Sequence, residues 1–519
     1  MQLKNYLTHK NIFLFGLVLL AAGIPVSRFL VSVSQFVLLG NWLIERDFLT
    51  KWSILKKSKA FWAFTGIFLF YVLGLLWTED YTYATKDLRI KLPMLWLPVL
   101  FFTSPQLSKK EYHSILHFFV AATVAATFWS MAVYLGLTHI KIHEVREISR
   151  FESHIRFSLM IVLSVLYLFF VLLKKDIARH KFIYATVLIW LLYFLILLQS
   201  FTGIIIAGII AFTALSWVLV SKNSILLKLS FSVLVITVVS YLAFVVIDEW
   251  KKYTTRKEVD YKTLPLATKN GETYSYDTVS KFTENGTRVW FYVAGKELKK
   301  EWDKRSWRPF DSLDFHGNAL RFTLIRYLSS KGYTKDSVGI SKLNEEDVKN
   351  IESGFPNYMY TNTSDMRTRI HELIWELDQA LEKQDPTGHS LSMRFEFWKT
   401  AWHIIKRHPL AGVGTGDVES ALKEQYTKDK TALNPKWQLH SHNQFLAVGI
   451  ALGFTGILFF LLSLLAPFIF TKNRSRFFVF FLLIQFLSFF NEDTLETQAG
   501  VTFCVFFTQL LFHNDEYNL

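Results

Sequence analysis

The chain has 519 residues, of which 51% are hydrophobic, 17% are aromatic and only 19% are charged. A soluble domain is about 25% charged, and a chain this apolar is not intrinsically disordered. The single cysteine, Cys504, excludes a disulfide framework and a cysteine-based metal site. The net charge of +14 would suit nucleic acid, but the apolar content indicates lipid instead, and we expect no nucleic acid partner.

Uncharged apolar runs recur along the chain and predict an all-α polytopic membrane protein. A helix that crosses a bilayer needs about 20 apolar residues, or about 17 at the short end. Shorter runs indicate helices that are tilted, broken or extended by polar residues. We expect about twelve transmembrane helices, near 12–22, 28–44, 60–77, 91–103, 114–137, 157–173, 182–199, 202–220, 225–247, 444–471, 477–490 and 499–513.

Lysine and arginine are concentrated in alternate short loops, which predicts the orientation of the helices. Loops on the cytoplasmic side carry an excess of these residues. The basic loops are 45–59, 104–113, 174–181 and 472–476, whereas 199–203 and 491–498 contain none. This pattern places both termini in the cytoplasm and the alternate loops on the outer face.

One long polar segment interrupts the apolar runs and predicts a three-part organisation. Residues 1–247 form an N-terminal transmembrane domain with about nine helices, and residues 444–519 form about three more. Between the predicted ninth and tenth helices, residues 248–443 form a large, mainly helical domain on the outer face. This segment contains 31 basic and 28 acidic residues, so most of the surplus positive charge lies in the membrane part.

Local patterns predict three elements inside the outer segment. Residues 288–294 (RVWFYVA) are rich in β-branched and aromatic side chains and predict a strand. Residues 366–383 have apolar side chains at helical spacing, which predicts an amphipathic helix. A second helix is predicted over 390–408, where Pro409 ends it.

A glycine-rich stretch follows that helix as P-L-A-G-V-G-T-G, residues 409–416. Glycine permits positive φ angles and close backbone approach, so the N–H groups of Gly414 and Gly416 can cradle an anion. The alternative is a loop that simply packs on the membrane surface. A Walker A loop is excluded because no Gly-Lys-Ser/Thr follows.

Two histidines, His440 and His442, stand just before a predicted membrane helix. The unperturbed pKa of histidine lies nearest to neutrality, so either side chain can accept or donate a proton. Their spacing also suits a metal, but nothing nearby completes a ligand set, and we expect no metal. The alternative role is an interfacial one at the membrane boundary.

Charged side chains at membrane boundaries are costly and often functional. Arg156 and His154 open a predicted helix on the outer face, where Arg156 is alternatively a lipid-facing anchor. The acidic loop 491–498 is alternatively a plain solvent loop. These residues, Arg394 and the histidines map to one face, whereas transporter sites lie near the midplane. The pattern suits chemistry on a lipid-anchored anionic substrate, with a transporter as the alternative.

The order of these motifs resembles the O-antigen ligase and polymerase superfamily. The residues that carry the resemblance are Arg394-x-x-x-Trp398, Pro409-Leu410-x-Gly412-Val413-Gly414-Thr415-Gly416, His440-x-His442-Asn443-x-x-Leu446 and Gly453-x-x-Gly456. The outer segment is also similar to the form found in Bacteroidetes-type members. Motif matches cover the last third to half of the chain, and the topology matches throughout.

The resemblance implies a GT-C-like, metal-independent, inverting glycosyltransferase of the bacterial inner membrane. Its donor is a glycan on undecaprenyl diphosphate at the periplasmic leaflet, and the acceptor of a ligase is lipid A–core. O-antigen polymerases and protein O-oligosaccharyltransferases share the same motifs and remain alternatives. No cofactor is implied.

The family's functional residues map onto particular positions of this chain. The essential periplasmic histidine corresponds to His442, and the loop arginine corresponds to Arg394. A second diphosphate-binding role falls to Arg156. The residues expected to bind substrate beside it are His154, His440, Asn443, Gly414 and Gly416. A further arginine of the family, in a Ser-Arg-x-Gly corner, is missing here, because that corner reads Ser200-Phe201-Thr202-Gly203.

Overall fold

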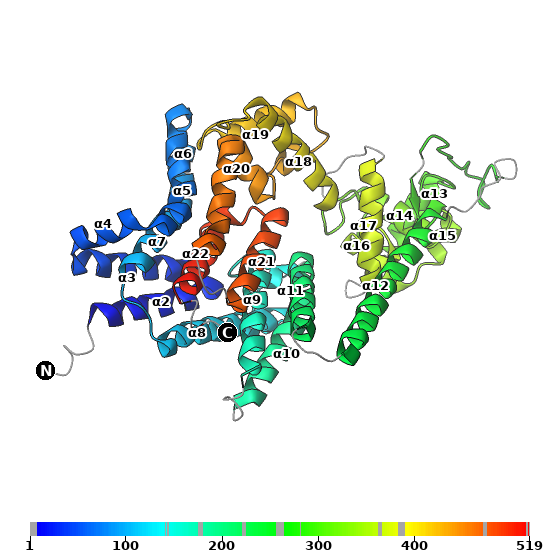
Figure 1. The fold of residues 1–519 in the computed structure, drawn as a ribbon. Coiled ribbons are helices and arrows are strands. Elements are labelled where there is room, and N and C mark those ends of the chain that lie inside the picture. Colours follow the sequence, from blue (N-terminus) through cyan, green and yellow to red (C-terminus); the bar gives the residue numbers. More distant parts are fainter. Residues whose placement is uncertain are drawn as a thin grey trace. The chain divides into compact units, whose positions relative to one another are not determined.

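Helices make up most of the chain in a computed structural model (Figure 1). By their internal contacts, the residues form two units, Lys222–Ser392 and the remainder, Met1–Ser221 with Met393–Leu519. The predicted outer domain therefore divides at Ser392, because its later part belongs to the same unit as most of the apolar helices. The structure describes residues 8–140, 142, 145–174, 180–220, 225–255, 264–280, 282–361, 366–381, 390–470, 475–514 and 517.

The first unit is a bundle of apolar helices. Within it, α2 packs against α3 and α8, and α5 packs against α20. Its helices are α2 (His9–Val26), α3 (Arg28–Glu45), α4 (Phe48–Lys57), α5 (Lys59–Leu73), η1 (Gly74–Trp77), α6 (Tyr81–Lys91), α7 (Pro93–Thr103), α8 (Lys109–Tyr134), η2 (Val145–Ile148), α9 (His154–Leu172), α10 (Lys181–Leu197), α11 (Phe201–Val220), α18 (Ser390–Arg407), α19 (Val418–Lys428), η5 (Pro435–Trp437), α20 (Gln444–Phe470), α21 (Arg476–Asn491), η6 (Thr494–Glu496) and α22 (Gln498–His513).

Hydroxyl side chains begin several of these helices by accepting a bond from an unpaired N–H of the first turn. Ser27 accepts from the N–H of Leu30 where α2 passes into α3, and Ser153 accepts from Arg156 at the start of α9. Ser108 forms a reciprocal capping box with Glu111 at the start of α8. The helices therefore begin where the polar residues interrupt the apolar runs.

Helix α20 is broken at Gly453, where the backbone takes a positive φ of 65°. The glycine-rich stretch fills the break. The N–H groups of Val413 and Gly414 donate to the carbonyls of Ile450 and Ala451, and the N–H of Phe454 donates to Pro409. Backbone groups that a broken membrane helix leaves unpaired are costly in lipid unless another segment satisfies them. The stretch 409–414 therefore supplies hydrogen-bond partners for the backbone at the break.

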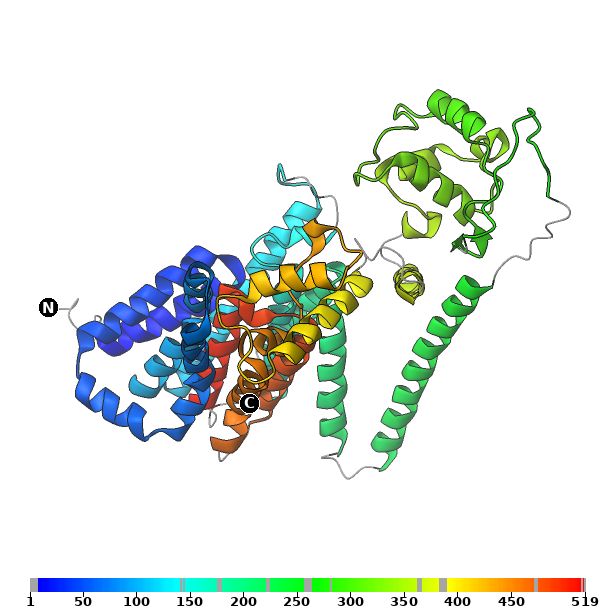
Figure 2. The same ribbon diagram turned by 90° about the horizontal axis from the view of Figure 1, so that it is seen from above.

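The second unit contains one long apolar helix and a cluster of short ones. Figure 2 shows α13 to α16 gathered compactly, around a core that includes the fully buried Trp302 and Leu328. Its elements are α12 (Ile225–Thr254), β1 (Thr283–Glu284), β2 (Thr287–Arg288), α13 (Gly295–Arg305), α14 (Leu320–Ser330), α15 (Ser337–Ser341), α16 (Glu345–Ser353), η4 (Tyr358–Thr361) and α17 (Met366–Leu381).

The predicted strand over 288–294 is wrong. Strand β2 ends at Arg288 and pairs antiparallel with β1 through a two-residue turn. Beyond it, Val293 makes only isolated bridges, and Tyr292 has a positive φ of 59° that breaks extended geometry. Phe291 is buried in this segment, and Val289 belongs to the core of the short helices. The apolar side chains therefore pack into a helical core rather than onto a sheet.

The helical character of the chain is confirmed, and its apolar helices are those of a membrane protein. Five helices of the described part are long and apolar enough to cross a bilayer, namely α2, α5 with η1, α8, α9 and α20. Four shorter apolar helices accompany them. Parts of two basic loops that carry the orientation prediction, 175–179 and 472–474, lie outside the described residues.

Candidate active site

His442 stands in the short loop between η5 and α20, where it adopts a positive φ of 45°. Such a backbone angle is uncommon for a residue with a side chain and is often found at functional sites. Its ring packs against Phe397 of α18, with centroids 5.6 Å apart. The ring contact therefore orients the His442 side chain, which is 30% exposed.

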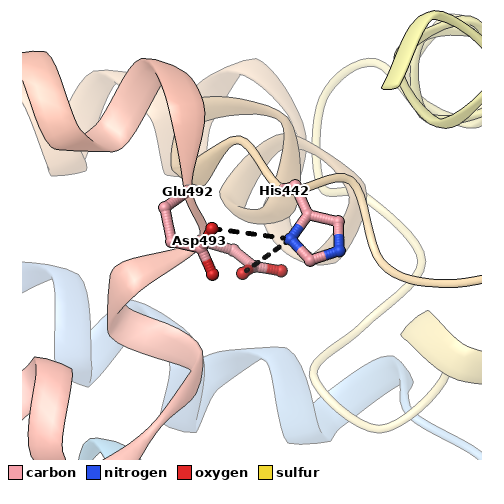
Figure 3. Close-up of side chains that lie close together, drawn as sticks. All are labelled: His442, Glu492 and Asp493. Atoms are coloured by element: carbon pink, nitrogen blue, oxygen red, sulfur yellow. Dashed lines mark ion pairs between the residues drawn. The ribbon is translucent and has the colours of Figure 1, made fainter. Parts of the chain in front are cut away.

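Two carboxylates face one nitrogen of this ring. The Nδ1 atom lies 3.7 Å from Glu492 Oε2 and 3.8 Å from Asp493 Oδ1, and dashed lines mark these two contacts in Figure 3. These distances exceed a normal hydrogen bond, so the contacts are ion pairs when the imidazole is charged. In the figure the other ring nitrogen points away from the carboxylates. His442 and the acidic loop after α21 therefore belong to one cluster of charged side chains.

The charges in this cluster depend on one another. Burial by itself would lower the pKa of His442, but interaction with Glu492 and the charge of Asp493 raise it above its ordinary value. Burial would raise the pKa of Glu492, but His442, Arg156 and Arg394 together hold it below its ordinary value. For Asp493, burial raises the pKa, and its acidic neighbours add to that effect. The contacts within the cluster therefore favour the charged forms of His442 and Glu492.

Both predicted arginines act on Glu492. Arg156, on the first turn of α9, has Nη2 3.5 Å from Glu492 Oε1, and its Nε is buried without a hydrogen-bond partner among the described residues. Arg394 of α18 donates to the side chain of Asn491, the last residue of α21. Asn491 in turn donates to Thr202. Arg394 is thus linked to the corner whose expected arginine is missing.

A cavity of about 340 Å³ opens beside this cluster. Arg156, His440, His442 and the acidic loop line one part of its wall, and α6 and α19 supply the rest. His154 lies at the start of α9, where the charges of Glu492 and Arg394 act on it. The structure therefore brings together His154, Arg156, Arg394, His440 and His442, which the sequence places far apart.

A buried network of charged side chains borders the cavity. Lys91, 1% exposed, pairs with Asp87 and lies 2.6 Å from Glu496 Oε2. Gln444, the first residue of α20, donates to Glu496 and accepts from the N–H of Leu495. Removal of one partner from a buried ion pair is strongly destabilising, because it leaves the other charge buried and unpaired. This network ties the acidic loop to the start of α20, two residues after His442.

Three residues predicted to bind substrate have structural partners instead. Asn443 donates to the carbonyl of Phe490 and accepts from the N–H of Leu446. The N–H of Gly414 is bonded to Ala451, and that of Gly416 is bonded to Thr78. The structure favours the packing alternative for the glycine-rich stretch, because these N–H groups already have partners.

Sequence reasoning did not assign roles to Glu492, Lys91 or Asp417. Asp417 accepts bonds from the N–H groups of Glu79 and Asp80, which fixes the turn before α6. The available signal was the rarity of carboxylates at membrane boundaries, which identified the acidic loop without its partner. His442, Glu492 and Asp493 also offer ligand atoms within 4.8 Å of one another, a spacing that can hold a cation.

Comparison with known proteins identifies part of this assembly. A family model described as O-Antigen ligase matches residues 353–461, which include Arg394, the glycine-rich stretch and His442. Members of that family are glycosyltransferase-like enzymes. No curated protein matches the chain. The match confirms, over residues 353–461, the resemblance to the O-antigen ligase superfamily seen in the motifs.

Proposed function

We propose that the chain is an O-antigen ligase-type glycosyltransferase, which moves a glycan from undecaprenyl diphosphate to lipid A–core on the periplasmic face of the inner membrane. The observation that carries the proposal is the pairing of His442 with Glu492 beside Arg156, at the wall of one cavity. The family match supports the reaction class, and the ligase role with these substrates is our inference.

His442 acts as the general base on the acceptor hydroxyl. Its Nδ1 faces Glu492 and Asp493, which favours the tautomer that carries the proton on Nδ1 and leaves Nε2 free to accept one. A carboxylate that orients histidine in this way also stabilises the imidazolium that forms. General base catalysis of this kind contributes about 10²–10⁴-fold in rate.

The arginines stabilise the leaving group. When undecaprenyl diphosphate departs, negative charge grows on the oxygen that joined the phosphate to the sugar. Guanidinium groups can form bidentate pairs with phosphate oxygens. Arg156 has an unpartnered Nε among the described residues, and its contact with Glu492 is long at 3.5 Å. Fixed cations of this kind replace a metal in our mechanism. Direct displacement by the hydroxyl inverts the anomeric carbon.

The topology that serves this chemistry has about twelve transmembrane helices with both termini in the cytoplasm. Residues 1–247 and 444–519 supply the membrane part, and the long segment 248–443 lies in the periplasm. The support is the basic character of alternate loops. Apolar surfaces of the membrane helices would accommodate the polyprenyl chain and surrounding lipids.

A deletion strain tests the proposal through its lipopolysaccharide. The ligase role predicts loss of all polymeric glycan from lipid A–core, together with accumulation of long lipid-linked glycan. A core that bears one repeat unit would instead identify a polymerase. Intact lipopolysaccharide with unglycosylated proteins would identify a protein O-oligosaccharyltransferase, and no change in any glycan would favour a transporter.

Complementation of the strain tests the site. The wild-type chain should restore the ladder, and His442→Ala should not. His403→Ala is the matched control, since His403 also pairs with a carboxylate, Asp429 at 2.9 Å, but does not line the cavity. Restoration by His442→Ala at normal protein level would refute the assignment.

A further inference from the structure

The second unit contains a cavity of its own, of about 470 Å³. It is lined by the last turns of α12, by Asn285 in the turn between β1 and β2, by η4 and by α17. Ligand pockets in proteins usually measure about 300–1,000 Å³, so the cavity is large enough for a sugar ring. All of its lining residues belong to the same unit.

Glu249 is the unusual member of the lining. Its side chain is 1% exposed, and its Oε1 accepts from Arg367 at 2.9 Å and from Lys252 at 3.0 Å. The other oxygen, Oε2, is buried and has no hydrogen-bond partner among the described residues. Leaving a buried polar atom without a hydrogen-bond partner destabilises a fold, and more so when the atom is charged. Glu249 therefore presents an acceptor that a ligand with a hydrogen-bond donor would satisfy.

The charges around Glu249 indicate a neutral ligand. Asp248 and Glu249 are both paired with Lys252 and Arg367, at distances of 2.8–3.0 Å. The two paired cations offset the two carboxylates, and the lining adds one further cation, Lys251, so the wall bears little net charge and has no cluster of carboxylates free for a metal ion. A ligand that donates through hydroxyl groups fits this wall best.

The remaining lining adds an aromatic face and further polar groups. Tyr358 lines the cavity and is 42% exposed, with Lys331 Nζ 5.8 Å from the centre of its ring. Thr255 and His371 also line it. An exposed aromatic ring beside hydroxyl, imidazole and carboxylate groups can contact both the apolar face and the hydroxyls of a sugar. The lining thus combines the two kinds of contact that a saccharide needs.

The position of the cavity along α12 fits a membrane-linked glycan. The apolar run that predicts the membrane span ends near 247, and the lining residues Asp248 to Thr255 follow at once. With a rise of 1.5 Å per residue, these residues lie within about two turns of the predicted membrane surface. Sugars attached to a membrane lipid pass at this level.

We propose that this cavity binds a neutral sugar unit of the glycan, with a sugar hydroxyl donating to Glu249 Oε2 and the ring lying against Tyr358. The inference rests on the proposed function, because it takes the same glycan as the ligand. The cavity holds the glycan near the enzyme and takes no part in bond formation.

Binding of free polysaccharide to the purified full chain in detergent tests the inference. The probe is the fluorescently labelled polysaccharide that mild acid releases from the producing strain's lipopolysaccharide, so it lacks lipid and diphosphate. Glu249→Gln and Tyr358→Ala should each weaken binding about tenfold, which corresponds to about 1.4 kcal/mol. Tyr358→Ala leaves the ion pairs of Glu249 intact, so it decides the matter if Glu249→Gln unfolds.

Two controls separate this site from the reaction. Glu346→Gln makes the same chemical change on the exposed face of α16 and should bind as the wild type does. His442→Ala should also keep its binding while it loses transfer. Wild-type affinity in both cavity variants, or binding of calcium chloride alone that Glu249→Gln abolishes, would overturn the inference. Transfer by the wild type, measured in parallel, decides the proposed function separately.

Discussion

Replacement of Glu492 by glutamine tests the carboxylate–histidine pair most sharply, because it removes one charge and keeps the shape. Two unit charges 4 Å apart interact by about 4 kcal/mol at the effective dielectric of a protein surface. That value is an upper bound for the 3.7 Å contact with His442, whose side chain is partly exposed. Asp493 remains 3.8 Å away and retains part of the effect.

We therefore expect Glu492→Gln to cost about 1–2 kcal/mol of transition-state stabilisation, or about 5–30-fold in rate. The pH profile should move as well. Carboxylates raise the pKa of His442, and a base works only when unprotonated, so the rising limb of the rate should shift to lower pH in the variant. The assay is glycan transfer by purified protein between pH 5 and 9.

Glu419→Gln provides the control for this measurement, since Glu419 lines the same cavity without contacting His442. It should leave the limb in place. An unchanged rate together with an unchanged limb in Glu492→Gln would show that the pair does not serve catalysis. A lower rate with an unmoved limb would mean that Glu492 acts through structure alone.

Three further predictions follow from the same structure. Lys91→Met should lower the melting temperature in detergent, because it leaves buried Asp87 and Glu496 unpaired at a cost of about 3 kcal/mol. Adding Glu496→Gln to this variant should partly restore the melting temperature. An unchanged melting temperature in Lys91→Met would contradict a role of the network in stability. Gly412→Ala should destabilise the fold by about 1–3 kcal/mol in denaturant titration, because φ is +67° and the new Cβ would meet the Ala451 backbone at 2.4 Å. Treatment with EDTA should leave transfer unchanged, whereas a loss that Mg²⁺ reverses would indicate a cation at His442.

The positions of the apolar helices could be predicted from the sequence because long uncharged apolar runs have few alternatives. Each predicted run coincides with a helix of the described part. The break in α20 was less accessible. The sequence shows a glycine at position 453, but the residues that hydrogen-bond to the backbone at the break, Pro409 and Val413, lie about forty residues earlier. Only the folded chain brings them together.

The candidate site was predictable in its residue types but not in its pairing. A histidine and two arginines on one face could be recognised, because charges are rare at membrane boundaries. That Glu492 would meet His442 depends on how α21 packs beside the start of α20, which no local pattern encodes. The same limit explains the strand error at 288–294, where Val289 packs into a helical core instead of onto a sheet.

In the proposed mechanism, His442 activates an acceptor hydroxyl against a lipid-diphosphate donor. Transfer is measured by mixing purified full chain with undecaprenyl-diphosphate-linked glycan and lipid A–core and following the glycosylated core with time. We expect product of inverted anomeric configuration from the wild type and from His403→Ala, and a rate about 10²–10⁴-fold lower from His442→Ala. Retention of configuration, or an undiminished rate in His442→Ala, would refute this mechanism.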